Sequence, residues 1–196
     1  MNQLTSEVGV DEVGRILVAA RFSAERHTYQ RRKGKRAEPY INHPPKVAEI
    51  LRIVGAVEAL EIIISALLHD TVEDTETTPS ELEELFGPRV RSIGMEITDD
   101  KSLPKARRKE LQIEHAPHLS SAAKQIKLVD QTTNIADVAF APAPDWTLER
   151  RSEYLRWAEA VVAGLRGCND QLEANFEVVL QKAWKQLKEE GMPSQW

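Results

Sequence analysis

The 196 residues of the chain suffice for one domain with a sizeable core, and a net charge of −5 with 29% charged residues is typical of an ordinary soluble protein. The negative charge disfavours nucleic acid as the main partner, and no apolar run approaches the roughly 18 residues of a membrane helix. Residues 1–14 lack the regions of a signal peptide, and Cys168 is the only cysteine, which excludes an intrachain disulfide and indicates a reducing, cytoplasmic setting.

The N-terminal part of the chain predicts two helices joined by a basic segment. Apolar residues at steps of three and four predict an amphipathic helix over residues 10–32. Five positive charges follow within residues 31–36, where a solvated loop is the ordinary interpretation and a polyphosphate clamp is the alternative. Two prolines suit the first turn of a second helix, over residues 44–54. His43 therefore lies at a helix entrance, as a cap or as a metal ligand.

The central segment joins an apolar run to a group of ionisable residues. The run at residues 62–68 lies within a stretch, 56–78, that is free of Gly and Pro and rich in helix formers, which favours a buried helix over a strand. The ionisable residues that follow are His69, Asp70, Glu73 and Asp74. At helical spacing they form two ridges, of which one suits a cation and the other proton transfer. A helix-terminal hydrogen bond and a solvated helix end are the alternative.

The second half of the chain also predicts helices. They are expected over residues 78–87, 89–98 and 104–115, from 120 to a break at 141–145, and over 147–188 with an interruption near 164–167. The polar helix at 104–115 is either solvated or covers a polar site. Asp130 comes directly after an apolar helical run, which predicts a buried acid. Its burial has either a structural reason, such as capping or pairing with an arginine, or a functional one. The chain is therefore predicted to be all-α, a single domain of about eight to ten helices.

Three separate segments of the chain are expected to form one candidate site. They contribute two imidazoles and two carboxylates, from His43, His69, Asp70 and Asp130. This mixed set suits Mn²⁺ or Fe²⁺, and less distinctively Zn²⁺ or Mg²⁺. A divalent ion acidifies bound water and neutralises phosphate oxygens, so hydrolysis of a phosphoester or pyrophosphate ester is the expected chemistry. Glu73 and Asp74 would handle protons, and the basic loop at residues 31–36 would clamp a polyphosphate or stack on a base.

These residues, in this order, resemble the signature of the HD-domain metal phosphohydrolases. More narrowly, the chain resembles the hydrolase domain of RelA/SpoT-type alarmone enzymes, above all the small alarmone hydrolases of the metazoan SpoT-homologue type. The segments that carry the resemblance are residues 31–33, 39–44, 67–75, 98–105 and 127–130, with a late segment from Tyr154 to Asn169. The likeness runs from about residue 19 to residue 182, which is most of the chain.

The resemblance implies an Mn²⁺-dependent 3′-pyrophosphohydrolase that converts guanosine tetraphosphate or pentaphosphate to GDP or GTP and pyrophosphate. It assigns metal binding to His43, His69, Asp70 and Asp130, and catalysis to Glu73 and Asp74. It assigns substrate contacts to Arg32 and Lys33 at the base, to Asn134 near the ribose and phosphate, and to Tyr154 in the pocket wall. It also implies that residues 1–196 are a single HD-type hydrolase domain without the synthetase domain of the long enzymes.

Two positions depart from the family pattern. Gln131 and Ala136 stand where relatives commonly carry positive charges, so the preferred nucleotide is open. Hydrolysis of another phosphorylated nucleotide such as NADPH is one alternative, and a non-catalytic nucleotide-binding module is another. The intact acidic pair argues against a pure binder. The oligomeric state is open.

Overall fold

The computed structural model describes residues 11–192, in which ten α-helices, two 3-10 helices and one isolated bridge between Arg31 and Pro39 are found. The α-helices are α1 (Glu12–Arg26), α2 (His43–Ile53), α3 (Leu60–Leu68), α4 (Thr71–Asp74), α5 (Pro79–Phe86), α6 (Pro88–Ile97), α7 (Lys105–His115), α8 (Ser121–Phe140), α9 (Leu148–Ala163) and α10 (Asp170–Glu189). The predicted all-α class is confirmed. Within the described range, no helix has the length and apolarity needed to cross a bilayer.

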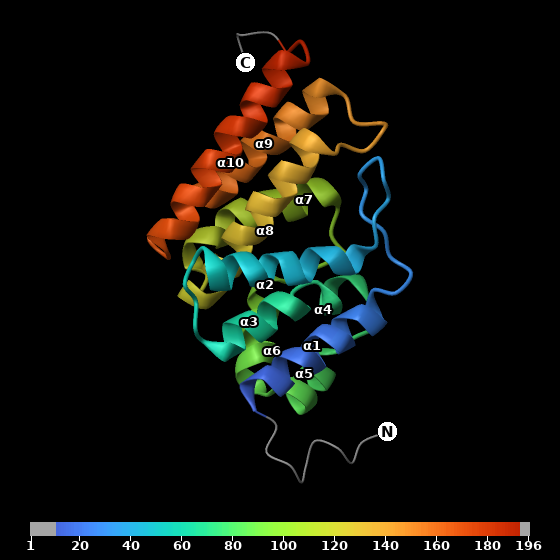
Figure 1. The fold of residues 1–196 in the computed structure, drawn as a ribbon, viewed down its shortest axis with the longest axis vertical. Coiled ribbons are helices and arrows are strands. Elements are labelled where there is room, and N and C mark those ends of the chain that lie inside the picture. The colour runs from blue at the N-terminus through green and yellow to red at the C-terminus, as the bar shows by residue number, and fades with distance from the viewer. Residues whose placement is uncertain (1–10, 193–196) are drawn as a thin grey trace.

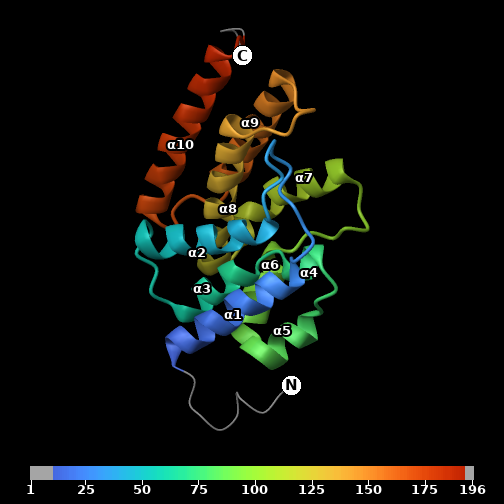
Figure 2. The same cartoon turned by 45° about the vertical axis from the view of Figure 1, so that its right-hand side comes forward.

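Helix α8 is the element on which the others assemble. It contacts α2, α3, α6, α9 and α10. Helix α2 crosses the middle of the molecule, with α1, α3, α5 and α6 on one side of it and α9 and α10 on the other (Figures 1 and 2). Ile126, Leu128 and Ile135 of α8 are fully buried in the hydrophobic core. Polar residues on the same helix are therefore carried into the centre of the protein.

Helix α1 is shorter than the helix predicted over residues 10–32. It ends at Arg26, where the hydroxyl of Thr28 donates to the carbonyl oxygens of Ala24 and Glu25 at 3.0 and 2.8 Å. This side chain competes with the main chain for the last carbonyls and turns the backbone out of the helix. The predicted start at residue 10, and most of the segment assessed for a signal peptide, lie outside the described residues.

The helix predicted to continue from the apolar run is two helices, because the main chain turns at His69. Side chains satisfy the carbonyls at the end of α3. His69 Nδ1 lies 2.8 Å from the carbonyl oxygen of Ala66, and the hydroxyl of Thr71 donates to the carbonyl of Leu68 at 2.7 Å. Helix α4 that follows is a single turn. Neither Gly nor Pro marks this break, which is why the local sequence does not predict it.

Elsewhere the helix boundaries follow local capping signals. The Thr78 hydroxyl accepts the N–H of Glu81 at 3.2 Å and starts α5, and Gly87, with φ of 92°, separates α5 from α6. The long C-terminal segment is divided into α9 and α10 as predicted. Helix α8 continues to Phe140, so Asp130, which comes directly after the apolar run, lies in the middle of the helix.

Arg151 joins the ends of three helices. Only 3% of this residue is exposed, and its guanidinium donates to the carbonyl oxygens of Val138 and Ala139 at the end of α8, at 2.9 and 2.7 Å. It also donates to the carboxylate of Glu190 after α10, at 2.5 and 3.0 Å. Hydrogen bonds from Arg151 and then from Gln186 lower the pKa of Glu190 to about 2. The contact therefore fixes α9 to both of its neighbours.

The variant Arg151→Met is expected to lower the free energy of unfolding by about 2–4 kcal/mol, because it leaves buried acceptors without their donor. Urea unfolding measures the loss. Arg150→Met is the matched control, since the exposed pair of Arg150 with Asp145 contributes at most about 1 kcal/mol. Since folding lowers the pKa of Glu190, the ionised carboxylate stabilises the folded protein at neutral pH. This stabilisation should be lost as the pH falls from 4.5 towards about 2, and the loss should occur only in proteins that keep Arg151. Equal losses for the two variants would contradict this account.

Candidate functional site

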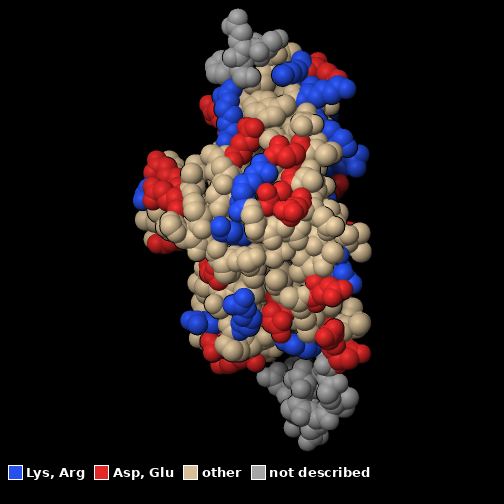
Figure 3. All heavy atoms as spheres, turned by 90° about the vertical axis from the view of Figure 1, so that its left-hand side faces the viewer, with Lys and Arg blue, Asp and Glu red and all other residues tan. Residues whose placement is uncertain are grey.

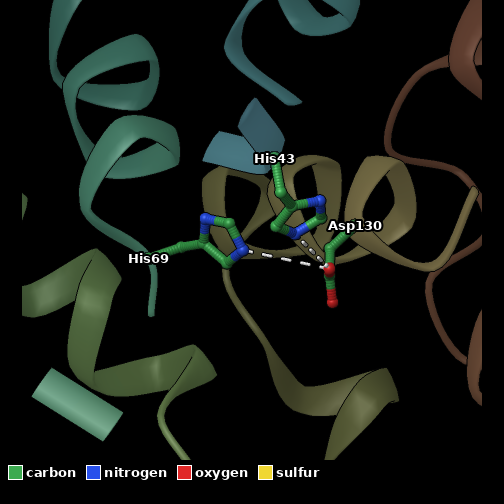
Figure 4. Close-up of side chains that lie close together, drawn as sticks. All are labelled: His43, His69 and Asp130. Atoms are coloured by element: carbon green, nitrogen blue, oxygen red, sulfur yellow. Dashed lines mark ion pairs between the residues drawn. The ribbon is translucent and has the colours of Figure 1, made fainter. Parts of the chain in front are cut away.

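Two imidazoles and a carboxylate from three separate helices meet inside the core. His43 begins α2, His69 follows α3 and Asp130 lies on α8, and the three side chains point toward one another (Figure 4). Their candidate ligand atoms all lie within 4.8 Å of one another. Asp70 approaches the same place, with Oδ2 2.9 Å from His69 Nε2 and 3.9 Å from His43 Nε2. The structure thus brings together the four residues for which metal binding is predicted.

The donor atoms of this cluster are arranged as those of metal ligands are. The Nε2 atoms of His43 and His69 are buried and make no hydrogen bond within the described part of the chain. Asp130 Oδ1 nevertheless lies 3.2 Å from His43 Nε2. The bond of His69 Nδ1 to the Ala66 carbonyl fixes the ring so that Nε2 faces the cluster. Two ligands each about 2.1 Å from a divalent ion and at right angles are roughly 3 Å apart, so these residues fit such an ion.

Burial and neighbouring charges set the protonation of the cluster. Burial lowers the pKa of His43, which keeps its imidazole neutral near pH 7. Burial acts in the same direction on His69, but the carboxylates of Asp70 and Asp130 outweigh it and raise the pKa of His69 to about 9. The pKa values of both carboxyls are lowered, because the adjacent imidazoles, together with Lys127 in the case of Asp130, outweigh the effect of burial. The centre of the cluster is therefore negative and attracts a cation.

Further side chains hold the carboxylates of the cluster in place. The Tyr40 hydroxyl donates to Asp70 Oδ2, and Asn134 Nδ2 donates to Asp130 Oδ1 at 2.6 Å. Lys127 Nζ lies 3.9 Å from Asp130 Oδ2. Neither Tyr40 nor Lys127 is among the predicted site residues. Each lies about one helical turn before a predicted ligand, and that spacing is the sequence signal by which it could have been found.

Glu73 and Asp74 lie on α4, beyond the cluster, and face the loop that precedes α7. The backbone N–H of Asp99 donates to Glu73 Oε2 at 3.0 Å. The ammonium group of Lys101 pairs with Asp74 and lies 3.7 Å from Glu73 Oε1. Burial raises the pKa of Glu73. The paired ridges expected of a continuous helix do not form, because the turn at His69 sends that side chain to the cluster while the acidic pair faces Asp99 and Lys101.

Arg32 is tied to the cluster through α8. It donates to Asn134 Oδ1 at 2.7 Å and to Asp137 Oδ2 at 2.7 and 3.2 Å. Burial alone would lower the pKa of Arg32, but the contact with Asp137 outweighs it and raises the pKa. The guanidinium also lies 5.5 Å from the ring centroid of Tyr40. Since Asn134 also donates to Asp130, one hydrogen-bonded path connects the cluster to Arg32.

The basic loop is held against the segment that follows α8. The N–H of Lys35 donates to the carbonyl of Pro142 at 3.1 Å. A Cβ atom at Gly34 would lie 2.6 Å from the carbonyl oxygen of Ala141, so only a glycine permits this approach. The loop therefore has a fixed place beside α8, and Arg32 with it.

Lys33 is exposed and belongs to a positive region shared with α7 and α9. Burial lowers the pKa of Lys105, and the charges of Lys33, Arg150 and Arg108 lower it further. A lysine pKa falls in this way where like charges dominate its surroundings. The region beside Arg32 is thus suited to an anion.

Tyr154 lies on α9 within an aromatic group. Its ring centroid is 5.7 Å from that of Trp146 and 5.1 Å from that of Trp157, and Lys109 Nζ lies 5.3 Å from the Tyr154 ring. Burial raises the pKa of Tyr154, so the hydroxyl is neutral. Trp157 is half-buried and lies beside this candidate wall of the pocket.

Comparison with known proteins places the chain in a family. A family model described as HD domain matches residues 19–156. The guanosine-3′,5′-bis(diphosphate) 3′-pyrophosphohydrolase MESH1 of Xenopus tropicalis is 51% identical over 162 residues, 83% of this chain and 90% of the relative. The protein of the same name from Drosophila melanogaster is 41% identical over 168 residues, 86% of this chain and 94% of the relative.

A solved structure gives the same relationship. It is described by the words "A metazoan ortholog of SpoT hydrolyzes ppGpp and plays a role in starvation responses". It matches with a TM-score of 0.83 at 40% identity and covers 86% of this chain and 94% of its own. The chain therefore belongs to the HD-domain family, among the relatives of the metazoan SpoT-homologue type.

Proposed function

We propose that this chain hydrolyses the 3′-pyrophosphate of guanosine tetraphosphate or pentaphosphate (ppGpp or pppGpp), releasing pyrophosphate and GDP or GTP. The observation that carries the proposal is the buried cluster of His43, His69 and Asp130, whose imidazole Nε2 atoms make no hydrogen bond among the described residues. The acidic pair follows it on α4, and the half-buried Arg32 is tied to it through Asn134. Such a set supplies a cation site, a proton carrier and a cationic contact for a nucleotide. The names of the relatives in Xenopus and Drosophila and the solved SpoT orthologue support this substrate.

We propose Mn²⁺ as the cation, ahead of Fe²⁺, Zn²⁺ or Mg²⁺. Two nitrogen and two oxygen donors suit its mixed ligand preference, and His43, His69, Asp70 and Asp130 would supply them. A divalent cation bound there activates a water molecule and neutralises phosphate charge.

The two acids of the catalytic pair have different tasks in this proposal. Glu73 takes the proton from the attacking water, because burial raises its pKa above that of an exposed carboxyl and makes it a better proton acceptor. Asp74 is held by Lys101 nearer to solvent, where it orients the water and the leaving oxygen, and the proton that Glu73 has taken is passed to that oxygen. The pair therefore divides proton transfer from positioning.

The substrate would extend from the cluster toward the basic loop. The base would stack on the guanidinium of Arg32 beside Lys33, with Asn134 at the ribose and phosphate and Tyr154 as a wall. The positive region around Lys105 favours the polyphosphate. Of the two departures from the family pattern, Gln131 is buried in α8 with 1% exposed, so charge at the mouth comes from other elements.

We also propose that residues 1–196 form one HD-type domain that acts in the cytoplasm on a small nucleotide. A single core cluster drawing on helices from α1 to α10 supports one domain, and the lone cysteine supports a reducing setting. On the face seen in Figure 3, positive and negative side chains of the described residues are interspersed without a broad basic patch, which argues against nucleic acid there.

With Mn²⁺ and ppGpp, purified protein is expected to release one pyrophosphate for each GDP. Glu73→Gln should lower kcat by about 10²–10⁴-fold, because it removes the proton acceptor and keeps the size of the side chain. Glu76→Gln, an exposed neighbour on the same segment, is the control and should retain the wild-type rate. No pyrophosphate from the wild-type protein would refute the proposal. Faster release of phosphate from NADPH in the same assay would replace it by the alternative substrate.

The hydrolysis rate should fall as the pH is lowered, with the acidic limb of kcat/KM above pH 4.5, the ordinary carboxyl value. The reason is that Glu73 must be deprotonated to act as a base and that burial raises its pKa. The residual rate of Glu73→Gln should lack this limb. A wild-type limb at or below pH 4.5 would count against Glu73 as the base.

Binding of Mn²⁺ to the folded protein alone should stabilise it by mass action and so raise the melting temperature. At a Mn²⁺ concentration of 100 times the dissociation constant, the gain in the free energy of unfolding is about 2.7 kcal/mol. Asp130→Asn should remove most of this effect, because it replaces a charged oxygen donor by a neutral amide. His118→Ala is the control, since His118 is exposed and distant in sequence from the cluster. A melting temperature unchanged by Mn²⁺ or by a chelator would contradict the shared site.

A further inference from the structure

Helix α7 lies beside the acidic pair although no residue in it is buried. We propose that Arg108 and Gln112 of this helix are positioning residues that hold Glu73 in its reactive orientation, acting directly and through Asp99. This inference rests on the proposed hydrolysis. The sequence predicts that α7 is either solvated or covers a polar site. In the structure its residues Arg108 and Gln112 face the candidate base and its neighbour Asp99, which fits the second alternative.

The contacts form a short path from α7 to Glu73. Gln112 Nε2 donates to Asp99 Oδ2 at 2.7 Å, and the backbone N–H of Asp99 donates to Glu73 Oε2 at 3.0 Å. The guanidinium of Arg108 lies 3.9 Å from Asp99 Oδ2 and 3.7 Å from Glu73 Oε1. Because Arg108 and Gln112 are four residues apart, one ridge of the helix makes both contacts.

Glu73 needs external support because its own helix is short. Helix α4 has four residues, and the chain becomes extended at Thr75 directly after it. A single helical turn does not by itself fix a long side chain. Helix α7, by contrast, has eleven residues and is anchored to α9 by the bond from Trp157 Nε1 to the carbonyl of Lys109, at 3.1 Å. The longer helix is thus the rigid partner.

The residues that connect α7 to Glu73 also line a cavity of about 180 Å³. Arg108, Gln112, Asp99 and Lys127 are among its lining residues. Arg108 Nε and Gln112 Oε1 are buried there without a hydrogen bond inside the described chain, one a donor and the other an acceptor. A cavity of this size with these polar groups in its wall admits water that satisfies both. Changes at these two positions therefore leave the apolar core intact, and variants should fold.

The test compares Arg108→Met and Arg108→Lys with Arg107→Met. Arg107 is the matched control because it lies on the same helix but pairs with Glu110 and Glu114 in solvent. With Mn²⁺ and ppGpp, Arg108→Met is expected to lower kcat at least about 10-fold and to change KM less than about 2-fold, since orientation and not binding is lost. Arg108→Lys should recover most of the rate, and Arg107→Met should match the wild type.

A second readout needs no turnover. The pKa of Glu73, followed by carboxyl ¹³C NMR, should rise by about one pH unit in Arg108→Met, because an opposite charge near the carboxyl is removed. The charged groups that face Glu73 are Asp70 before α4, Asp74 on α4, Asp99 and Lys101 in the loop, and Arg108 on α7. Gln112→Met keeps every charge and should lower kcat while moving this pKa less.

The outcomes separate the two proposals. A rise in KM alone would make Arg108 a substrate contact, and unchanged kcat and pKa in Arg108→Met would make it a surface residue; either result overturns the inference. If the wild-type protein makes no pyrophosphate, the proposed function fails, and the NMR comparison of Arg108→Met with Arg107→Met still decides whether Arg108 acts on Glu73.

Discussion

A carboxylate buried in the middle of α8 is the constraint on which the rest of the structure depends. An isolated anion in an apolar core is costly unless it is paired or bound to a metal. Asp130 is met by His43 at 3.2 Å, by Asn134 at 2.6 Å and by Lys127 at 3.9 Å. The entrance of α2 and the end of α3 therefore have to be placed beside the centre of α8. A divalent cation would further offset the free-energy cost of burying the carboxylate. The same buried charge that is costly without a partner therefore creates the cation site.

The same helix sets the distance between the cation site and the nucleotide contact. Asp130, Asn134 and Asp137 lie at successive turns of α8, and Asn134 bonds both to Asp130 and to Arg32. Arg32 comes from an irregular loop, whose position would otherwise vary. Asn134 and Asp137 of α8 hold its guanidinium, and Gly34 lets the loop approach the end of α8. The irregular segment is thereby fixed at one distance from the cation site.

Local signals were sufficient to predict most of the fold, but not the turn at His69. The convergence of the four candidate ligands was predicted from their donor chemistry and from the resemblance to the HD-domain hydrolases. Thr78 and Gly87 mark their helix ends by capping chemistry that is written in the neighbouring residues. The turn at His69 arises from side chains that take the carbonyls of α3, in a stretch of good helix formers without Gly or Pro. Propensity alone cannot anticipate such competition. Arg108 escaped prediction for a related reason, since its contact with Glu73 joins positions far apart in the chain.

The acidic pair shows how tertiary surroundings give neighbouring residues different chemistry. Glu73 and Asp74 are adjacent carboxylates on one turn, and nothing in their local sequence tells which one carries a proton. Burial and the negative charge around Glu73 raise its pKa, whereas Asp74 is paired with Lys101 at the solvent side. Two acids in unlike environments are what separate proton transfer from electrostatic positioning. The loop before α7 contacts both acids, through Asp99 at Glu73 and through Lys101 at Asp74, and Arg108 of α7 lies behind it. This loop and α7 therefore determine the different roles of the two acids.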